Sequence, residues 1–127
     1  YVNESILIDN LDVALVKSDI IVITLPLTDD TKHLINEEKI NVMKDSTVLI
    51  NLSRGGIIDE TDLIEFLNKD KFLGVALDVF KEEPLKESPL WDFEQVIITP
   101  HNSFVSDKVK ERLFELIIEN LSRGVMR

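Results

Sequence analysis

Four short apolar segments, separated by polar and amphipathic stretches, constrain the fold of this chain more than any other feature. They are rich in Ile and Val and cover residues 20–24, 48–52, 72–79 and 96–99. Runs of this length and composition are typical of strands that are buried on both faces. Apolar residues at helical spacing predict helices over residues 11–17, 36–43, 59–68 and 105–121. Strands that alternate with helices predict an α/β fold, with a parallel sheet covered on both sides.

Residues 47–56 show how one of these strands ends. The apolar run stops at Ser53, and Arg54 then stands directly before Gly55 and Gly56. Glycines tolerate positive φ and let main chain come close to a ligand or to another segment. An arginine at a strand end presents a rigid fork of donors that holds a carboxylate or phosphate at two points. Taken by itself, the segment is more typical of an ion-paired surface arginine beside a loop.

Polar residues follow the other predicted strands as well. Asp78 ends the third strand, Glu83 comes shortly after it, and His101 follows the fourth. Ligands of open parallel sheets bind outside the carboxyl ends of the strands, so these side chains and Arg54 should meet at one edge. They combine a fork for an anion, an imidazole for proton transfer and carboxylates that orient it. Without a cysteine or a metal, this set fits hydride transfer to a 2-keto acid, in which the arginine holds the carboxylate and the histidine protonates the carbonyl oxygen.

Each residue of this set also has a purely structural interpretation. His101 is compatible with a turn histidine bonded to backbone, and Asp78 with a strand-end residue that caps neighbouring main chain. Glu83 lies in an acidic stretch, where a solvated role is common. Thr31 is compatible with a plain turn residue and His33 with a surface or packing residue. The case for a joint site therefore depends on such residues occurring at successive strand ends.

Composition argues against several classes of function. The chain has 24 acidic and 14 basic residues among 127, and its net charge of −10 argues against nucleic acid or an anionic membrane as partner. Its histidines and carboxylates show no metal-ligand spacing, so no metal site is expected. No apolar run reaches membrane-spanning length. The absence of cysteine suits a reducing compartment, and we expect a cytoplasmic protein.

Four linked motifs, at residues 25–31, 51–60, 76–85 and 99–101, resemble those of one enzyme family. In order and spacing they are similar to the D-isomer-specific 2-hydroxyacid dehydrogenases, the group that includes phosphoglycerate and formate dehydrogenases. The resemblance covers nearly the whole chain. It implies a Rossmann-type fold that binds NAD. It also implies an oxidoreductase that transfers a hydride between NAD(H) and a D-2-hydroxy acid or 2-keto acid.

The resemblance further implies roles for individual residues. Arg54 is expected to bind and polarise the substrate, His101 to donate or accept the proton, and Glu83 to be the carboxylate partner of the histidine. Asp78 matches the family position that binds the nicotinamide carboxamide. The implied cofactor-binding residues are Thr24, Pro26, Thr31, Ser53, Arg54, Asp78, His101 and Ser103.

The chain also departs from the family pattern. It has neither the Gly-x-Gly-x-x-Gly turn nor the acidic residue that holds the ribose, and it begins with Tyr1 shortly before an apolar stretch at residues 6–8. We therefore expect residues 1–104 to be the carboxyl-terminal half of an NAD-binding Rossmann domain. Residues 105–127 are expected to be a helix that returns toward a substrate domain absent from this sequence. Because the pyrophosphate anchor is missing, the fragment alone should bind NAD(H) poorly and be inactive.

The sequence also predicts self-association, and it bears on two alternative functions. An unpaired sheet edge and apolar surface favour self-association, so we expect a homo-oligomer, in the simplest case a dimer. A non-catalytic NAD-sensing binding module or co-repressor would carry the same motifs and stays open. A phospho-acceptor signalling domain is also α/β, but it needs an acidic cluster directly after its first strand, whereas Asp29 and Asp30 follow a Pro-Leu-Thr segment.

Overall fold

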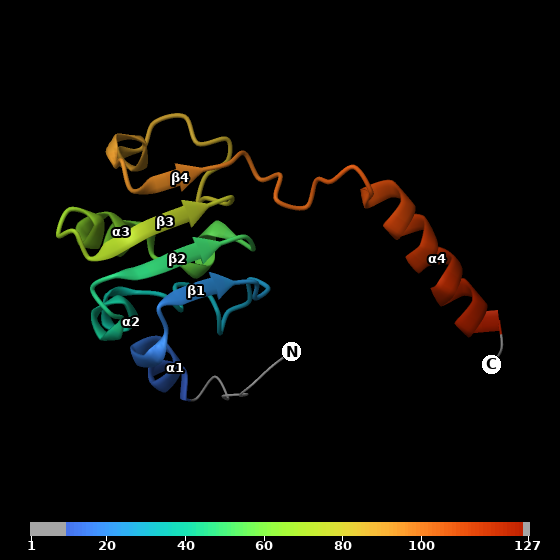
Figure 1. Ribbon diagram of the computed structural model, residues 1–127, viewed down its shortest axis with the longest axis horizontal. Helices are drawn as coiled ribbons and strands as arrows, with labels where there is room; N and C mark the ends of the chain where they lie inside the picture. Colours follow the sequence, from blue (N-terminus) through green and yellow to red (C-terminus); the bar gives the residue numbers. More distant parts are fainter. Residues whose placement is uncertain (1–9, 126–127) are drawn as a thin grey trace.

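The apolar segments form four parallel strands that lie side by side in the order of the sequence (Figure 1). The computed structural model describes residues 10–125, so the apolar stretch at residues 6–8 lies outside the described part. The strands are β1 (Ile20–Ile23), β2 (Thr47–Asn51), β3 (Phe72–Leu77) and β4 (Val96–Ile98). All three strand pairs are parallel, which confirms the predicted α/β class.

Helices form where apolar residues recur at helical spacing. The first precedes the first strand, and the next two connect consecutive strands. They are α1 (Leu11–Lys17), α2 (Glu37–Val42) and α3 (Glu60–Leu67), with short 3₁₀ turns η2 (Gly55–Ile57) and η3 (Pro89–Asp92). The Asn36 side chain caps α2 by accepting a hydrogen bond from the Lys39 N–H. Asp59 caps α3 in the same way, because its carboxylate accepts from the N–H groups of Thr61 and Asp62.

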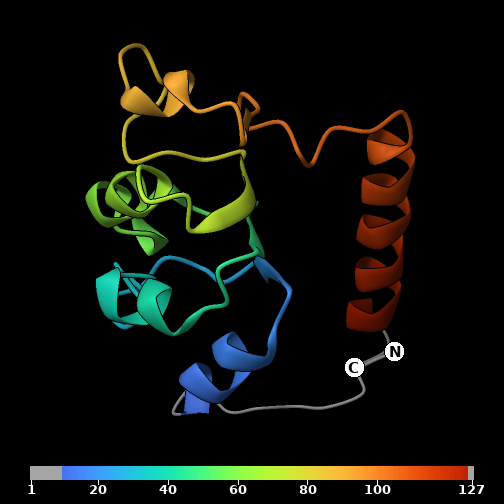
Figure 2. The same cartoon turned by 60° about the vertical axis from the view of Figure 1, so that its left-hand side comes forward.

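α1, α2 and α3 lie on the same face of the sheet (Figure 2). Between them and the strands is the apolar core, whose most deeply buried side chains include Ile40, Leu49, Ile57, Leu63 and Leu67. This one-sided arrangement follows from the topology. Every crossover steps to the next strand in the same direction, and crossovers of the same hand then place their helices on one side.

The opposite face of the sheet is apolar and bare in the described part of the chain. One row across it runs through Val22, Ile50, Ala76 and Ile97, which are register neighbours. Val22 is 50% exposed and Ile97 is 65% exposed. The expectation that helices cover both sides of the sheet is therefore wrong for residues 10–125. Strand sequence reports how apolar a face is, but not whether this chain supplies the layer that covers it.

Helix α4 (Val109–Val125) stands apart from the sheet at the end of an irregular segment (Figures 1 and 2). It begins later than predicted, because residues 102–108 form turns, in which the Val105 N–H donates to Asn102 O and the Val109 N–H to Ser106 O. Leu113, Phe114 and Ile117 are exposed on it. Among the described helices, none combines the length and apolarity needed to cross a bilayer.

Candidate active site

The carboxyl ends of the strands bring the predicted site residues to one edge of the sheet. Asn51 is the last residue of β2 and leads to Arg54, while Asp78 directly follows β3. β4 ends at Ile98, and Thr99–His101 leave it at the same edge, because Leu77 of β3 pairs with Ile98 of β4. This shared edge was predicted from the parallel topology, and the register between neighbouring strands decides which side chains touch.

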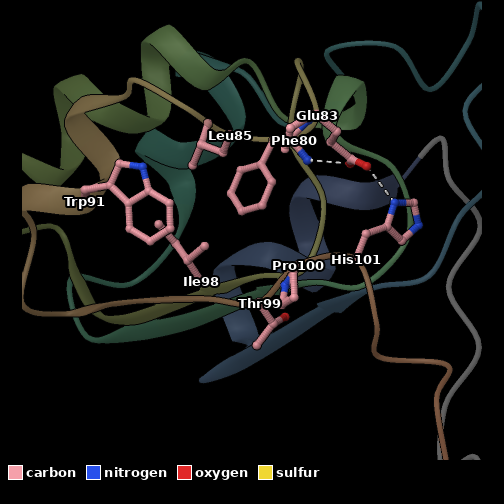
Figure 3. A pocket seen from close by; sticks show the side chains of 9 residues that line it. Phe80, Glu83, Leu85, Trp91, Ile98, Thr99, Pro100 and His101 are labelled. Atoms are coloured by element: carbon pink, nitrogen blue, oxygen red, sulfur yellow. Dashed lines mark hydrogen bonds and ion pairs between the residues drawn. The ribbon is translucent and has the colours of Figure 1, made fainter.

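Glu83 and His101 form an ion pair at this edge. Glu83 Oε2 lies 2.7 Å from His101 Nδ1, and the two side chains are 35% and 37% exposed. Glu83 Oε1 accepts a hydrogen bond of 3.0 Å from the Phe80 N–H, and Figure 3 shows both interactions as dashed lines. Because Nδ1 is held by Glu83, Nε2 is the ring atom through which His101 can exchange a proton with a ligand.

The pKa of Glu83 is lowered from its ordinary value, and the causes describe its surroundings. The largest is the hydrogen bond from the Phe80 N–H, which outweighs the opposing effect of burial. The hydrogen bond and charge of His101 lower the pKa further, as does the positive charge of Arg54. Glu83 is therefore ionised at neutral pH, and Arg54 is near enough for its charge to act on the same group.

Asp78 is fully buried and holds the loop that carries His101. Its carboxylate accepts hydrogen bonds from the Thr99 hydroxyl and from the Asn102 N–H (2.9 Å) and Ser103 N–H (2.9 Å). Burial by itself would raise the pKa of Asp78, but the hydrogen bonds from Thr99, Ser103 and Asn102 outweigh it and hold the pKa well below its usual range. This is the main-chain capping role that the sequence left open, and a contact of Asp78 with nicotinamide stays a prediction.

The backbone of His101 lies in the left-handed region, with φ at 51°. Its N–H donates to Thr99 O at 3.0 Å, so the chain reverses tightly between β4 and the residues bound by Asp78. Asp78 therefore fastens the loop on both sides of the histidine. The turn interpretation of His101 and its pairing with Glu83 hold together, because the backbone makes the turn and the imidazole makes the ion pair.

Arg54 leaves β2 on a turn that is organised by the buried side chain of Asn51. Asn51 Nδ2 donates to Arg54 O at 3.0 Å, and its Oδ1 accepts from both the N–H and the hydroxyl of Ser53 at 3.1 Å. The guanidinium itself is exposed, and its Nη1 donates to Ser53 O. This role of Asn51 was not predicted, although an amide at the end of an otherwise apolar strand was a usable signal.

Two cavities flank this edge and divide the predicted residues between them. The first, about 600 Å³ in volume, has Glu83 and His101 on one side and the apolar side chains of Phe80, Leu85, Trp91 and Ile98 on the other (Figure 3). The second, about 720 Å³, is lined by residues 24–27 and 52–54, and so includes Thr24, Pro26, Ser53 and Arg54. Trp91, the only tryptophan of the chain, was not among the predicted site residues.

The remaining candidates have local partners. The Thr31 hydroxyl donates to Pro26 O at 2.7 Å and accepts from the Thr28 N–H at 2.8 Å, which shapes the segment that lines the second cavity. His33 is ion-paired with Asp59 at 3.2 Å, in agreement with a packing role. No cluster of three or more potential metal ligands occurs within residues 10–125.

Comparison with known proteins identifies relatives over most of the chain. Residues 2–103 match the family model of the D-isomer specific 2-hydroxyacid dehydrogenase NAD binding domain. Glyoxylate reductase of Thermofilum pendens is 42% identical over 113 residues, which are 88% of this chain and 33% of the relative. D-3-phosphoglycerate dehydrogenase of Methanocaldococcus jannaschii is 36% identical over 117 residues, or 92% of this chain and 22% of the relative.

Solved structures give the same result. A D-isomer specific 2-hydroxyacid dehydrogenase from Xanthobacter autotrophicus, in complex with NADPH and MES, is 34% identical with a TM-score of 0.81, over 93% of this chain and 48% of that one. D-lactate dehydrogenase from Aquifex aeolicus, complexed with NAD and lactic acid, is also 34% identical, with a TM-score of 0.75 over 92% and 40%. The chain thus spans less than half the length of each of these relatives.

Proposed function

Because the chain belongs to the D-isomer-specific 2-hydroxyacid dehydrogenases, through their NAD-binding domain, we propose that it works as part of such an enzyme. In a polypeptide of the relatives' length, residues 1–104 form the second half of a Rossmann domain and residues 105–127 return toward a substrate domain. The reaction is hydride transfer between NAD(H) and a D-2-hydroxy acid or its 2-keto acid. The observation that carries this proposal is the Glu83–His101 pair, 2.7 Å apart, at the sheet edge that also carries Arg54.

The chain's own residues divide the work of the reaction. The Arg54 guanidinium binds the carboxylate of the 2-keto acid and draws electron density from the neighbouring carbonyl. His101 gives a proton from Nε2 to the carbonyl oxygen as it becomes an alkoxide, and takes it back in the reverse direction. Glu83, ionised beside Nδ1, stabilises the protonated imidazole and fixes the ring. Bound NADH supplies the hydride that reduces the carbonyl carbon.

The residues around the second cavity fit part of a dinucleotide. Leu25 and Leu27 expose apolar surface suited to a flat ring, and the Arg54 guanidinium adds positive charge in a strongly acidic chain. The Gly-rich turn that anchors a pyrophosphate at a helix N-terminus is not among these residues. We therefore expect the 127-residue chain to bind NADH much more weakly than the longer polypeptide. Calorimetric titration of NADH into each of the two polypeptides measures these affinities. Equal affinities would contradict the inference that the 127-residue chain holds only part of the NADH site.

The activity is tested with the longer polypeptide by following NADH oxidation with glyoxylate and other 2-keto acids. Arg54→Ala and His101→Ala should each abolish turnover. Arg54→Lys should also be damaging, because a lysine cannot form the bidentate contact with a carboxylate. A polypeptide that binds NADH tightly but reduces no 2-keto acid would overturn the proposal in favour of a cofactor-sensing or co-repressor module.

We also propose a homo-oligomeric, cytoplasmic protein. Support for self-association comes from the exposed apolar row on the bare sheet face and the exposed apolar residues of α4. Sedimentation over a range of concentrations checks the assembly, and a monomer at the highest concentration would count against it. Support for the compartment is the lack of cysteine together with the family membership, and cell fractionation measures it directly.

A further inference from the structure

Residues 78–80 are called here the β3 exit. They contact the segments that carry Arg54, Glu83 and His101, the three residues proposed for catalysis. Asp78 binds the loop of His101, and Phe80 binds Glu83 through its N–H. The Phe80 backbone also lies against Gly55, the residue next to Arg54. Three segments that are far apart in sequence are thus fastened to one short piece of main chain.

The contact with Glu83 is directional. The Phe80 N–H points at Oε1 at 3.0 Å, which leaves Oε2 to face His101 Nδ1 at 2.7 Å. A carboxylate fixed through one oxygen cannot rotate freely about its last bond. The β3 exit therefore sets where the second oxygen, and with it the imidazole, can lie.

The contact with the His101 loop is made through a buried charge. Asp78 receives the N–H groups of Asn102 and Ser103, both at 2.9 Å, and the Thr99 hydroxyl. These donors stand on both sides of His101, whose own backbone is left-handed. Because the carboxylate is fully buried, water does not compete for these bonds.

The contact with the Arg54 turn is steric. A Cβ added at Gly55 would lie 2.0 Å from the carbonyl carbon of Phe80, 2.1 Å from its oxygen and 2.5 Å from its Cα. These are backbone atoms, so no side chain can swing aside to make room. Only glycine allows the turn after Arg54 to approach the β3 exit this closely. The other arm of the turn is held by Asn51, which accepts from Ser53 and donates to Arg54 O.

We propose that the β3 exit is the positioning element of this site, which holds Arg54 in register with the Glu83–His101 pair through Gly55, Phe80 and Asp78. This role rests on the proposed reaction, whose chemistry demands it. The carboxylate and carbonyl of a 2-keto acid are joined by a single bond, so the guanidinium and imidazole must keep a fixed separation. A displacement of about 1 Å costs roughly a hundredfold in rate when groups are aligned in this way.

The decisive comparison is Gly55→Ala against Gly74→Ala in the longer, active polypeptide. Gly74 lies in β3 itself, and its added Cβ would meet only Gln95 O, at an ordinary 3.8 Å. Gly55→Ala should lower kcat by roughly a hundredfold, and Gly74→Ala by less than about threefold. An equal effect of the two substitutions would overturn the proposal.

A second readout is independent of turnover. If Gly55→Ala displaces Phe80, Glu83 loses its main-chain donor and its pKa rises, while the charged groups that face it, His101 and Arg54, remain. Carboxyl-carbon NMR should therefore show Glu83 titrating at higher pH in Gly55→Ala than in Gly74→Ala, and an unmoved titration would contradict the role of Phe80. If this shift occurs in a polypeptide that reduces no 2-keto acid, the positioning element stands and the proposed function fails.

Asp78→Asn tests the contact of the β3 exit with the His101 loop. It is the deciding variant for the positioning role if Gly55→Ala does not fold. The amide keeps the shape of the carboxylate but turns an NH₂ group toward one of its donors. A positioning role predicts that kcat at saturating NADH falls at least about tenfold, whether or not the affinity for NADH also falls through the predicted nicotinamide contact. Unchanged kcat, or a loss confined to NADH affinity as expected for a nicotinamide contact alone, would overturn it.

Discussion

The stability of the fold should depend strongly on the carboxylate of Asp78, and Asp78→Asn removes its charge together with one of its two acceptor oxygens. The wild-type carboxylate is fully buried and accepts three hydrogen bonds, from Thr99, Asn102 and Ser103. An asparagine offers one oxygen, so one donor loses its acceptor, at a cost of about 1–3 kcal/mol. The two remaining bonds lose their charge assistance, about 1 kcal/mol each. Relief of the desolvation of a buried charge offsets part of this loss, and we expect a net destabilisation of about 3 kcal/mol.

Urea unfolding followed by circular dichroism measures this effect. With a slope of about 1.5 kcal/mol per molar urea, the midpoint should fall by about 2 M at pH 7. Because the pKa of Asp78 is lowered by folding, its contribution is complete above the unfolded value of about 3.9 and declines as the pH falls toward the folded value. The gap between wild type and Asp78→Asn should therefore stay constant from pH 7 to about pH 5 and narrow below about pH 4.

Asp30→Asn provides the control, because Asp30 lies exposed in the turn after residue 28. It should change the free energy of unfolding by no more than about 0.5 kcal/mol. Equal stability of wild type and Asp78→Asn at pH 7 would refute the assignment of the three hydrogen bonds. A gap that widens in acid would refute the sign of the pKa shift.

Three further predictions concern other parts of the fold. Asn51→Ala should lower the free energy of unfolding in urea by about 2–3 kcal/mol, because the N–H and the hydroxyl of Ser53 lose their common acceptor. A neutral effect would contradict this buried hydrogen-bond network. Asp59→Ala removes the N-cap of α3 and should lower the free energy of unfolding by about 1 kcal/mol and Tm by about 3–5 °C. An unchanged Tm would show that this cap does not stabilise the fold. Ile97→Lys, on the bare sheet face, should shift sedimentation toward monomer without loss of stability; unchanged assembly would exclude this face.

Much of the fold was predictable because strands and helices leave a local pattern of apolar residues in the sequence. The runs at residues 20–24 and 48–52 became β1 and β2, and the stripe before Asn68 became α3. The meeting of Arg54, Glu83 and His101 at one edge was predictable for a different reason. Parallel strands end at the same edge, whatever their separation along the chain.

The other features of the site and fold depend on distances between residues that are far apart in the sequence, and local patterns do not report these distances. The pairing of Leu77 with Ile98 places the residues after β4 beside the Asp78 carboxylate, where the N–H groups of Asn102 and Ser103 donate to it. A contact of Asp78 with nicotinamide stays a prediction. The contact of Gly55 with Phe80 joins residues with no local pattern in common. The bare face could not be foreseen either, because an apolar strand face looks the same whether or not a second layer covers it.

The left-handed backbone at His101 affects how its chemistry should be probed. At φ 51°, histidine and asparagine are tolerated far better than most side chains, and a β-branched residue would be a genuine outlier. A substitution such as His101→Val would therefore disturb the loop's conformation together with its acid–base group, and the two losses would be inseparable. His101→Asn deletes the imidazole while respecting the torsion angles. The residue assigned to the proposed proton transfer is also one that this bend accommodates.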